Sequence, residues 1–164
     1  MRYIFFNKKN IYNEISIYKF KMDREKLLKS LEDENNEHLL NVTSSKLIEI
    51  NYNMIKELNL EKTEMMRMMK ILKGYRYVDE MNELKYGAYI RWIPILNPRE
   101  IIIKKGAIFC DVNITEDGVY LICKNYGSVS KYFRIKLDEC LVFQKLTEQE
   151  KVLLSVMDHL SENN

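Results

Sequence analysis

The segment 84–144 opens with Leu84-Lys85-Tyr86-Gly87-Ala88-Tyr89-Ile90-Arg91-Trp92-Ile93 and nears its end with Phe133-Arg134-Ile135-Lys136-Leu137. Between these two stretches, short β-branched and aromatic runs are broken by Gly, Pro, Asn and Asp. Such a pattern is typical of antiparallel strands joined by tight turns. It predicts a small sheet that curls on itself.

The turn and bend residues of this segment set the limits of the expected strands. Asp117-Gly118 predicts a tight hairpin turn, because glycine supplies the positive φ that such a turn needs. Lys104-Lys105-Gly106 predicts a bend within a long strand. We expect strands near residues 75–79, 87–95, 100–111, 118–124 and 131–143. Five such strands predict a small SH3-like antiparallel β-barrel.

Helical patterns lie on both sides of the strands. Leucines at helical spacing follow Asp23, and a helical hairpin is expected over residues 43–73. Thr147-Glu148-Gln149-Glu150 is a capping box that predicts a C-terminal helix. Short strands are also expected near 2–6 and 14–21. The fold class is therefore α+β, with an N-terminal strand and helical region (1–74), a small β-barrel (75–146) and a C-terminal helix packed on the rest (147–164).

Composition sets limits on the class of protein. The 164 residues carry a formal net charge of +2, with a basic first 22 residues and an acidic last 18. No window is apolar enough to span a bilayer, so no membrane partner is expected. The three cysteines, Cys110, Cys123 and Cys140, are odd in number and lie in apolar runs, which favours an intracellular, reducing compartment.

No catalytic constellation is present in the sequence. The five glycines are isolated, so no phosphate-binding loop is expected, and no Cys-x-x-Cys or His-Glu-x-x-His occurs. Buried cysteines usually behave as small hydrophobic residues rather than nucleophiles. We therefore expect no catalytic, cofactor-binding or metal-binding residues, and a protein that is not an enzyme.

Two groups of residues are candidates for an interaction site. Tyr89 and Arg91 share one side of their strand, and Trp92 lies on the other. The alternative is that Trp92 is core and Arg91 is a surface charge whose stem lies on Tyr89. The second group is Lys8, Lys9, Lys19 and Lys21, which belong to a basic stretch interleaved with aromatic residues, as in single-stranded nucleic-acid binders. An ordinary edge strand would show the same alternation.

The charges of the barrel segment favour one kind of partner over another. Nucleic-acid binding requires clustered Lys and Arg. Here the basic residues of the barrel segment are nearly matched in number by Asp and Glu. A protein partner or self-association, through aromatic and Met-rich surfaces, is therefore favoured over nucleic acid. Nucleic-acid binding through the basic N-terminal stretch and a barrel face remains the alternative.

The barrel segment resembles a small barrel found in uncharacterised proteins of large nucleocytoplasmic DNA viruses. The residues that carry the resemblance are Leu84-x-x-Gly87-x-x-Ile90-Arg91-Trp92, Lys105-Gly106-Ala107-Ile108, Val119-Tyr120-Leu121 and Phe133-Arg134-Ile135-x-Leu137. The resemblance implies a structural or protein-interaction component of a virion or virus factory, in the host cytoplasm or the particle. It implies no functional residue, and it covers less than half of the chain.

Overall fold

The computed structural model describes residues 24–162, in two compact units. Among the described residues, one unit contains 24–46 with 147–162, and the other contains Leu47–Leu146. The segments expected from the sequence (1–74, 75–146 and 147–164) remain a prediction. The strands expected near 2–6 and 14–21 lie outside the described residues.

The first unit is helical among its described residues. It contains α2 (Arg24–Glu32), the 3-10 helix η1 (Glu34–Leu39) and α5 (Glu148–Glu162). Its core lies between α2 and α5 and contains Leu27, Leu31, Leu40, Leu153, Val156, Met157 and Leu160. Burial of these apolar side chains is what holds the C-terminal helix in place.

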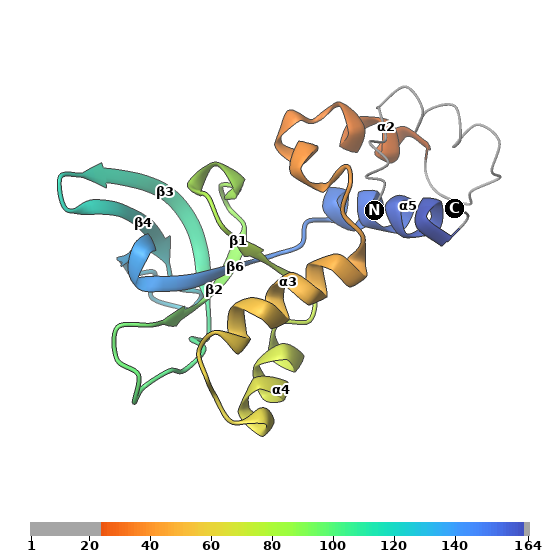
Figure 1. The fold of residues 1–164 in the computed structure, drawn as a ribbon. Helices are drawn as coiled ribbons and strands as arrows, with labels where there is room; N and C mark the ends of the chain where they lie inside the picture. The colour runs from red at the N-terminus through yellow and green to blue at the C-terminus, as the bar shows by residue number, and fades with distance from the viewer. Residues whose placement is uncertain (1–23, 163–164) are drawn as a thin grey trace. The chain divides into compact units, whose positions relative to one another are not determined.

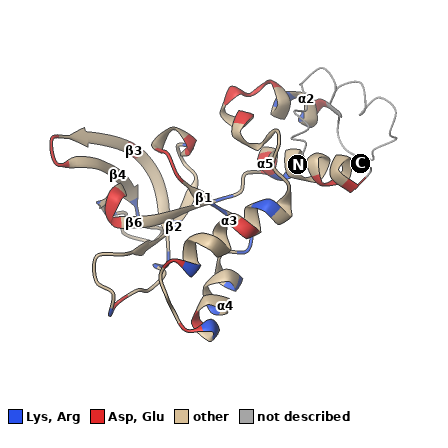
Figure 2. Ribbon diagram, viewed as in Figure 1, with Lys and Arg blue, Asp and Glu red and all other residues tan. Residues whose placement is uncertain are grey.

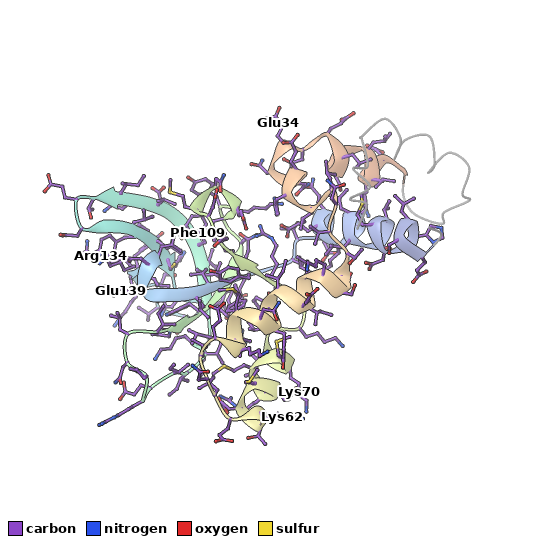
Figure 3. All side chains as sticks on the ribbon, viewed as in Figure 1. Glu34, Lys62, Lys70, Phe109, Arg134 and Glu139 are labelled. Atoms are coloured by element: carbon purple, nitrogen blue, oxygen red, sulfur yellow. The ribbon has the colours of Figure 1, made fainter. Side chains whose placement is uncertain are left out.

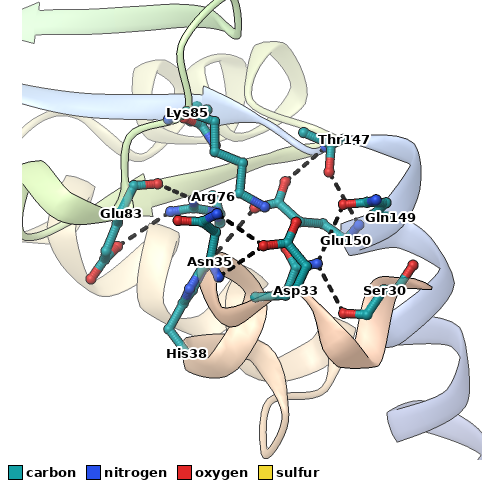
Figure 4. Close-up of polar contacts among 12 residues, drawn as sticks. Ser30, Asp33, Asn35, His38, Arg76, Glu83, Lys85, Thr147, Gln149 and Glu150 are labelled. Atoms are coloured by element: carbon teal, nitrogen blue, oxygen red, sulfur yellow. Dashed lines mark hydrogen bonds and ion pairs between the residues drawn. The ribbon is translucent and has the colours of Figure 1, made fainter. Parts of the chain in front are cut away.

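The capping box at the start of α5 is present as predicted. The backbone N–H of Glu150 donates to Thr147 Oγ1 at 3.2 Å, and the N–H of Thr147 donates to Glu150 Oε2 at 2.7 Å (Figure 4). These reciprocal bonds satisfy donors that a helix N-terminus leaves without intrahelical partners. The predicted C-terminal helix is therefore confirmed.

The second unit contains the expected helical hairpin. The helices are α3 (Ser44–Lys56), whose residues from Leu47 onward belong to this unit, and α4 (Lys62–Ile71). Thr43 Oγ1 accepts from the Lys46 N–H at 3.2 Å at the start of α3. Asn59 lies between the helices with φ at 53°, and Gly74 follows them with φ at 80°. Each left-handed position lies three residues after the end of its helix, where the chain changes direction.

A six-stranded antiparallel sheet forms the rest of this unit. Its strands are β1 (Tyr75–Val78), β2 (Tyr89–Pro94), β3 (Ala107–Thr115), β4 (Gly118–Lys124), β5 (Tyr132–Lys136) and β6 (Cys140–Lys145). The order is β1-β6-β2-β3-β4-β5, and 3-10 helices η2 (Met81–Glu83) and η3 (Leu137–Glu139) lie in connections. Figure 1 shows β3 and β4 as a long, curved hairpin. The sheet is open, so the predicted closed barrel is not confirmed.

Two of the predicted strands are corrected. The expected strand 131–143 is divided by η3, after which β6 leaves β5 and inserts between β1 and β2. The expected strand 100–111 begins only at Ala107, because Ile101 and Ile103 pack against the α3–α4 core. Residues 75–145 therefore contain six strands rather than the five expected there. The bulge lies between Phe109 and Asp111, after the predicted bend at Gly106.

The two sides of the sheet have different surroundings. The inner side carries one core, with Val78, Ile90, Phe109, Leu121, Cys123, Ile135 and Val142 among its members. On the outer side, α3 and α4 pack over Ile93, Leu141 and Phe143 of β2 and β6. That second core contains no residue of β3, β4 or β5. The outer side of these three strands therefore lies outside the core that the helical hairpin builds.

Candidate binding surface on β4 and β5

Strand alternation builds a polar and aromatic surface on the uncovered strands. Leu121, Cys123 and Ile135 are buried in the inner core, so their neighbours point to the outer side. These neighbours are Tyr120, Ile122 and Lys124 on β4, and Tyr132, Arg134 and Lys136 on β5. We name this set of six residues the β4–β5 face.

The strand register places each cation of this face beside an aromatic ring. Tyr120 pairs with Lys136, Ile122 with Arg134, and Lys124 with Tyr132. Arg134 Cζ lies 5.1 Å from the centroid of the Tyr120 ring, and Lys124 Nζ lies 5.9 Å from that of Tyr132. Both distances are within the range of cation–π contacts. The face therefore presents two tyrosines and their cations on a rigid hairpin.

The hairpin that carries this face is entirely free of acidic residues. Residues 118–136 contain Lys124, Lys131, Arg134 and Lys136 and no Asp or Glu. Lys136 Nζ pairs with Glu139 at 3.2 Å, and this hydrogen bond is the main cause that raises the pKa of Lys136. Within residues 24–162, no carboxylate forms an ion pair with Lys124 or Arg134. Figure 2 shows the acidic residues at the tip of the β3–β4 hairpin instead.

The connection between β4 and β5 extends this surface. The Asn125 N–H donates to the Lys131 carbonyl at 3.1 Å, and the Lys131 N–H donates to Asn125 Oδ1 at 2.7 Å. Asn125 thereby fixes both ends of the loop. Tyr126 and Tyr132 are 83% and 66% exposed, which is far from the burial that aromatic rings usually reach.

Tyr89 and Arg91, proposed from the sequence, lie on the same outer side of the sheet but are engaged within the fold. Arg91 Nε donates to the Tyr75 hydroxyl at 3.3 Å, and its guanidinium lies 5.7 Å from the Tyr75 ring centroid. The Tyr89 hydroxyl donates to the Lys105 carbonyl at 3.0 Å. Trp92 is half-buried on the inner side, 5.7 Å from Phe133 between ring centroids. Lys8, Lys9, Lys19 and Lys21 lie outside the described residues.

Two of the cysteines have properties that disfavour nucleophilic chemistry. Burial raises the pKa of the Cys123 thiol to about 12 and that of Cys140 to about 11. A thiol with such a pKa stays protonated near neutral pH, and the thiolate is the nucleophilic form. Neither residue is therefore suited to attack a substrate.

A cavity of about 480 Å³ lies at one end of the sheet. Its lining is mostly apolar, and its polar groups include Asp79, Asp138 and the Cys140 thiol. The two carboxylates belong to exposed residues, and no group of His, Cys, Asp and Glu within residues 24–162 could hold a metal ion.

Arg76 and the Oε1 atom of Gln144, both buried in the sheet unit, have structural partners. Arg76 is 1% exposed, and it donates to the Glu83 carbonyl at 2.6 Å and to Glu83 Oε2 at 3.2 Å (Figure 4). Burial raises the pKa of Glu83, which Arg76 partly opposes. The Lys85 N–H donates to Gln144 Oε1 at 2.7 Å. These contacts tie β1 and β6 to the connection before β2, which is a role in folding.

Comparison with protein-family models, curated proteins and solved structures found no match for this chain. Among the described residues, no helix has the length and hydrophobicity needed to cross a bilayer. The candidate site is therefore defined by the geometry of the chain itself. The sequence signal that would have located the β4–β5 face is the acid-free stretch 118–136, which the charge balance of the whole barrel segment conceals.

Proposed function

We propose that the chain is a non-enzymatic interaction protein that holds its partner on the β4–β5 face. The observation that carries the proposal is the combination, on two adjacent strands, of tyrosines with cations that no described carboxylate neutralises. A surface without a binding role more often carries interspersed charges of both signs. A concentration of one charge with exposed aromatic rings favours recognition of a partner.

A protein partner, or a second copy of the chain, is supported by a separate feature. The connection between β2 and β3 exposes Leu96 and Ile102, at 69% and 51%. Exposed large aliphatic side chains are candidates for contact with a protein partner. Self-association through this connection would leave the β4–β5 face free for another ligand.

The SH3-like relationship and the viral setting are also proposals. The curled hairpin of β3 and β4 and the tight turn at Gly118 support the first. The resemblance of the segments around Trp92, Gly106 and Phe133 supports the second, which would make the chain a virion or virus-factory component. A solved structure showing closure between the β1 and β5 edges would support the SH3-like assignment.

The test of the proposed function compares two double variants of equal charge. Lys124→Glu with Arg134→Glu alters the β4–β5 face, and Lys62→Glu with Lys70→Glu alters exposed lysines of α4, which lie apart from Arg134 (Figure 3). Each protein is titrated against single- and double-stranded oligonucleotides and an acidic peptide, with light scattering on the same samples.

We expect saturable binding of at least one of these ligands by the unaltered chain. The face variant should lose this binding, and the α4 variant should keep it. Binding that survives the face variant, or no binding of any ligand by a strict monomer, would contradict the proposed function.

A further inference from the structure

We propose that the β4–β5 face binds single-stranded nucleic acid, with Lys124 and Arg134 at phosphates and Tyr120 and Tyr132 stacked on bases. This inference rests on the proposed function, because it names the partner of the same surface. It also assigns the contact with nucleic acid to the β4–β5 face rather than to the basic N-terminal stretch.

The charges of the face complement a phosphate backbone. Lys124 and Arg134 have no carboxylate partner among the described residues, so a phosphate would not have to displace an ion pair. Lys131, at the end of the adjoining loop and directly before Tyr132 in the sequence, adds a third exposed cation. Each such contact releases counterions from the nucleic acid, which makes affinity depend on salt.

The tyrosines favour a single strand over a duplex. A base can stack on an aromatic ring only when its face is accessible, and a duplex hides the faces of its bases. Tyr120 and Tyr132 lie on adjacent strands, four residues apart in register, or about 13 Å along the strands. Arg134 lies between these two stacking positions in the register, and Lys124 lies opposite Tyr132. This spacing follows the alternation of bases and phosphates along one strand.

The same features make an acidic peptide a poorer match. Such a peptide supplies negative charge but no flat π surface for the tyrosines. Ile122, the aliphatic residue of the face, is half-buried between the cations and offers little area to a peptide side chain. The combined aromatic and cationic surface is therefore explained more fully by a nucleic acid.

The test titrates the full chain into labelled oligo(dT) and oligo(U) of about 20 nucleotides, a length above the usual site size. Anisotropy is read at salt concentrations from about 50 to about 200 mM. A plot of the logarithm of the binding constant against the logarithm of the salt concentration should have a slope of about −2, which corresponds to three phosphate contacts. Arg134→Ala should weaken binding and reduce the slope by about 0.7.

Tyr132→Ala gives a second, independent readout. Loss of one base stack should weaken binding roughly 5-fold to 140-fold while leaving the salt slope unchanged, because stacking releases no counterions. Tyr52→Ala, at an exposed tyrosine of α3, and Lys62→Ala are the matched controls and should bind as the unaltered chain does. Melting curves verify that each variant is folded.

Several results would overturn the inference. Equal affinity for duplex and single strand, with no effect of Tyr132→Ala, would mean charge attraction alone. Loss of binding on charge reversal at Lys8, Lys9, Lys19 and Lys21, but not at Arg134, would place the contact in the N-terminal stretch. Binding of an acidic peptide through Arg134, with no binding of oligonucleotides, would remove this inference and keep the proposed function. Binding of none of these ligands would remove both.

Discussion

At the residue scale, Asn51 shows how one side chain completes the sheet. Its Nδ2 donates to the Tyr75 carbonyl at 2.8 Å, and its Oδ1 accepts from the Tyr77 N–H at 2.9 Å. These are the two bonds that a further strand would make with the free side of β1. Because edge strands with open backbone groups promote aggregation, Asn51 also protects this edge.

We predict that Asn51→Ala lowers the free energy of unfolding by roughly 1–3 kcal/mol, since it leaves buried backbone groups without partners. Trp92, the single tryptophan, reports unfolding of the sheet unit by fluorescence during urea titration. Asn53→Ala, at an exposed asparagine of the same helix, is the control and should change little. Equal stability of the two variants would show that the paired bonds contribute nothing.

The thiols of Cys123, which is buried, and Cys140, which is half-buried, should be labelled slowly and should make the free energy of unfolding depend on pH. Because burial raises the pKa of Cys123 to about 12 and of Cys140 to about 11, both thiols should react with iodoacetamide far more slowly in the folded chain than in urea. The unfolded chain loses these protons near the ordinary pKa of 9.0.

The contribution of these two thiols to the free energy of unfolding should therefore be fully present below pH 9. It should be lost as pH rises through the folded pKa values. The slope is about 1.4 kcal/mol per pH unit for each thiol. Urea titrations across this range, with Cys123→Ala for comparison, measure the effect. Rapid native labelling of Cys123 would contradict the account and reopen the possibility of an enzyme.

At the element scale, Gly106 fixes the entry to β3. Its φ is +112°, and a Cβ there would lie 2.7 Å from the Ile90 carbonyl oxygen and from the Tyr89 ring. We predict that Gly106→Ala destabilises the sheet unit by roughly 1–3 kcal/mol from backbone strain alone. Gly127→Ala, where a Cβ meets nothing within 4 Å, should stay within about 0.5 kcal/mol. Trp92 fluorescence in urea compares the two, and a harmless Gly106→Ala would refute the role given to this residue.

The C-terminal helix α5 is predicted to be integral to the first unit. Deletion of residues 147–164 removes Leu153, Val156, Met157 and Leu160, and it exposes Leu27 and Leu31 of α2. The exposed apolar surface should cause aggregation, seen by light scattering. A truncated chain that stays monomeric, with an unchanged melting temperature, would rule this out.

Local signals predicted the elements that depend on local chemistry. The capping box at Thr147, the positive φ at Gly118 and the alternation of β4 act over a few residues, so the sequence located these features well. The route of β6 between β1 and β2 depends on pairing between distant residues. Periodicity carries no information on such pairing, and the sequence pattern therefore predicted a single strand over 131–143.

The candidate site was harder to predict for the same reason. Tyr89 and Arg91 were correctly placed on one side of β2, yet their contacts with Lys105 and Tyr75 depend on the fold. The cations of β4 and β5 become one surface only when the register sets Arg134 beside Tyr120. Asn51 gave no sequence signal at all, because a single amide in a helix is ordinary.

At the scale of the whole molecule, charge is distributed unevenly although the total is small. The net charge of +2 and the even balance across residues 75–146 favoured a protein partner over nucleic acid. The segment 118–136 nevertheless holds four basic residues and no acidic one. Local charge on a surface, rather than the sum over a segment, decides the attraction of a polyanion.

The most direct test of the central claim is to map backbone amide shifts of the ¹⁵N-labelled full chain by NMR during titration with oligo(dT). The account predicts that the largest shifts fall on residues of the β4–β5 face and on the loop between Asn125 and Lys131. Largest shifts on residues 1–22, or on α3 and α4, would contradict it.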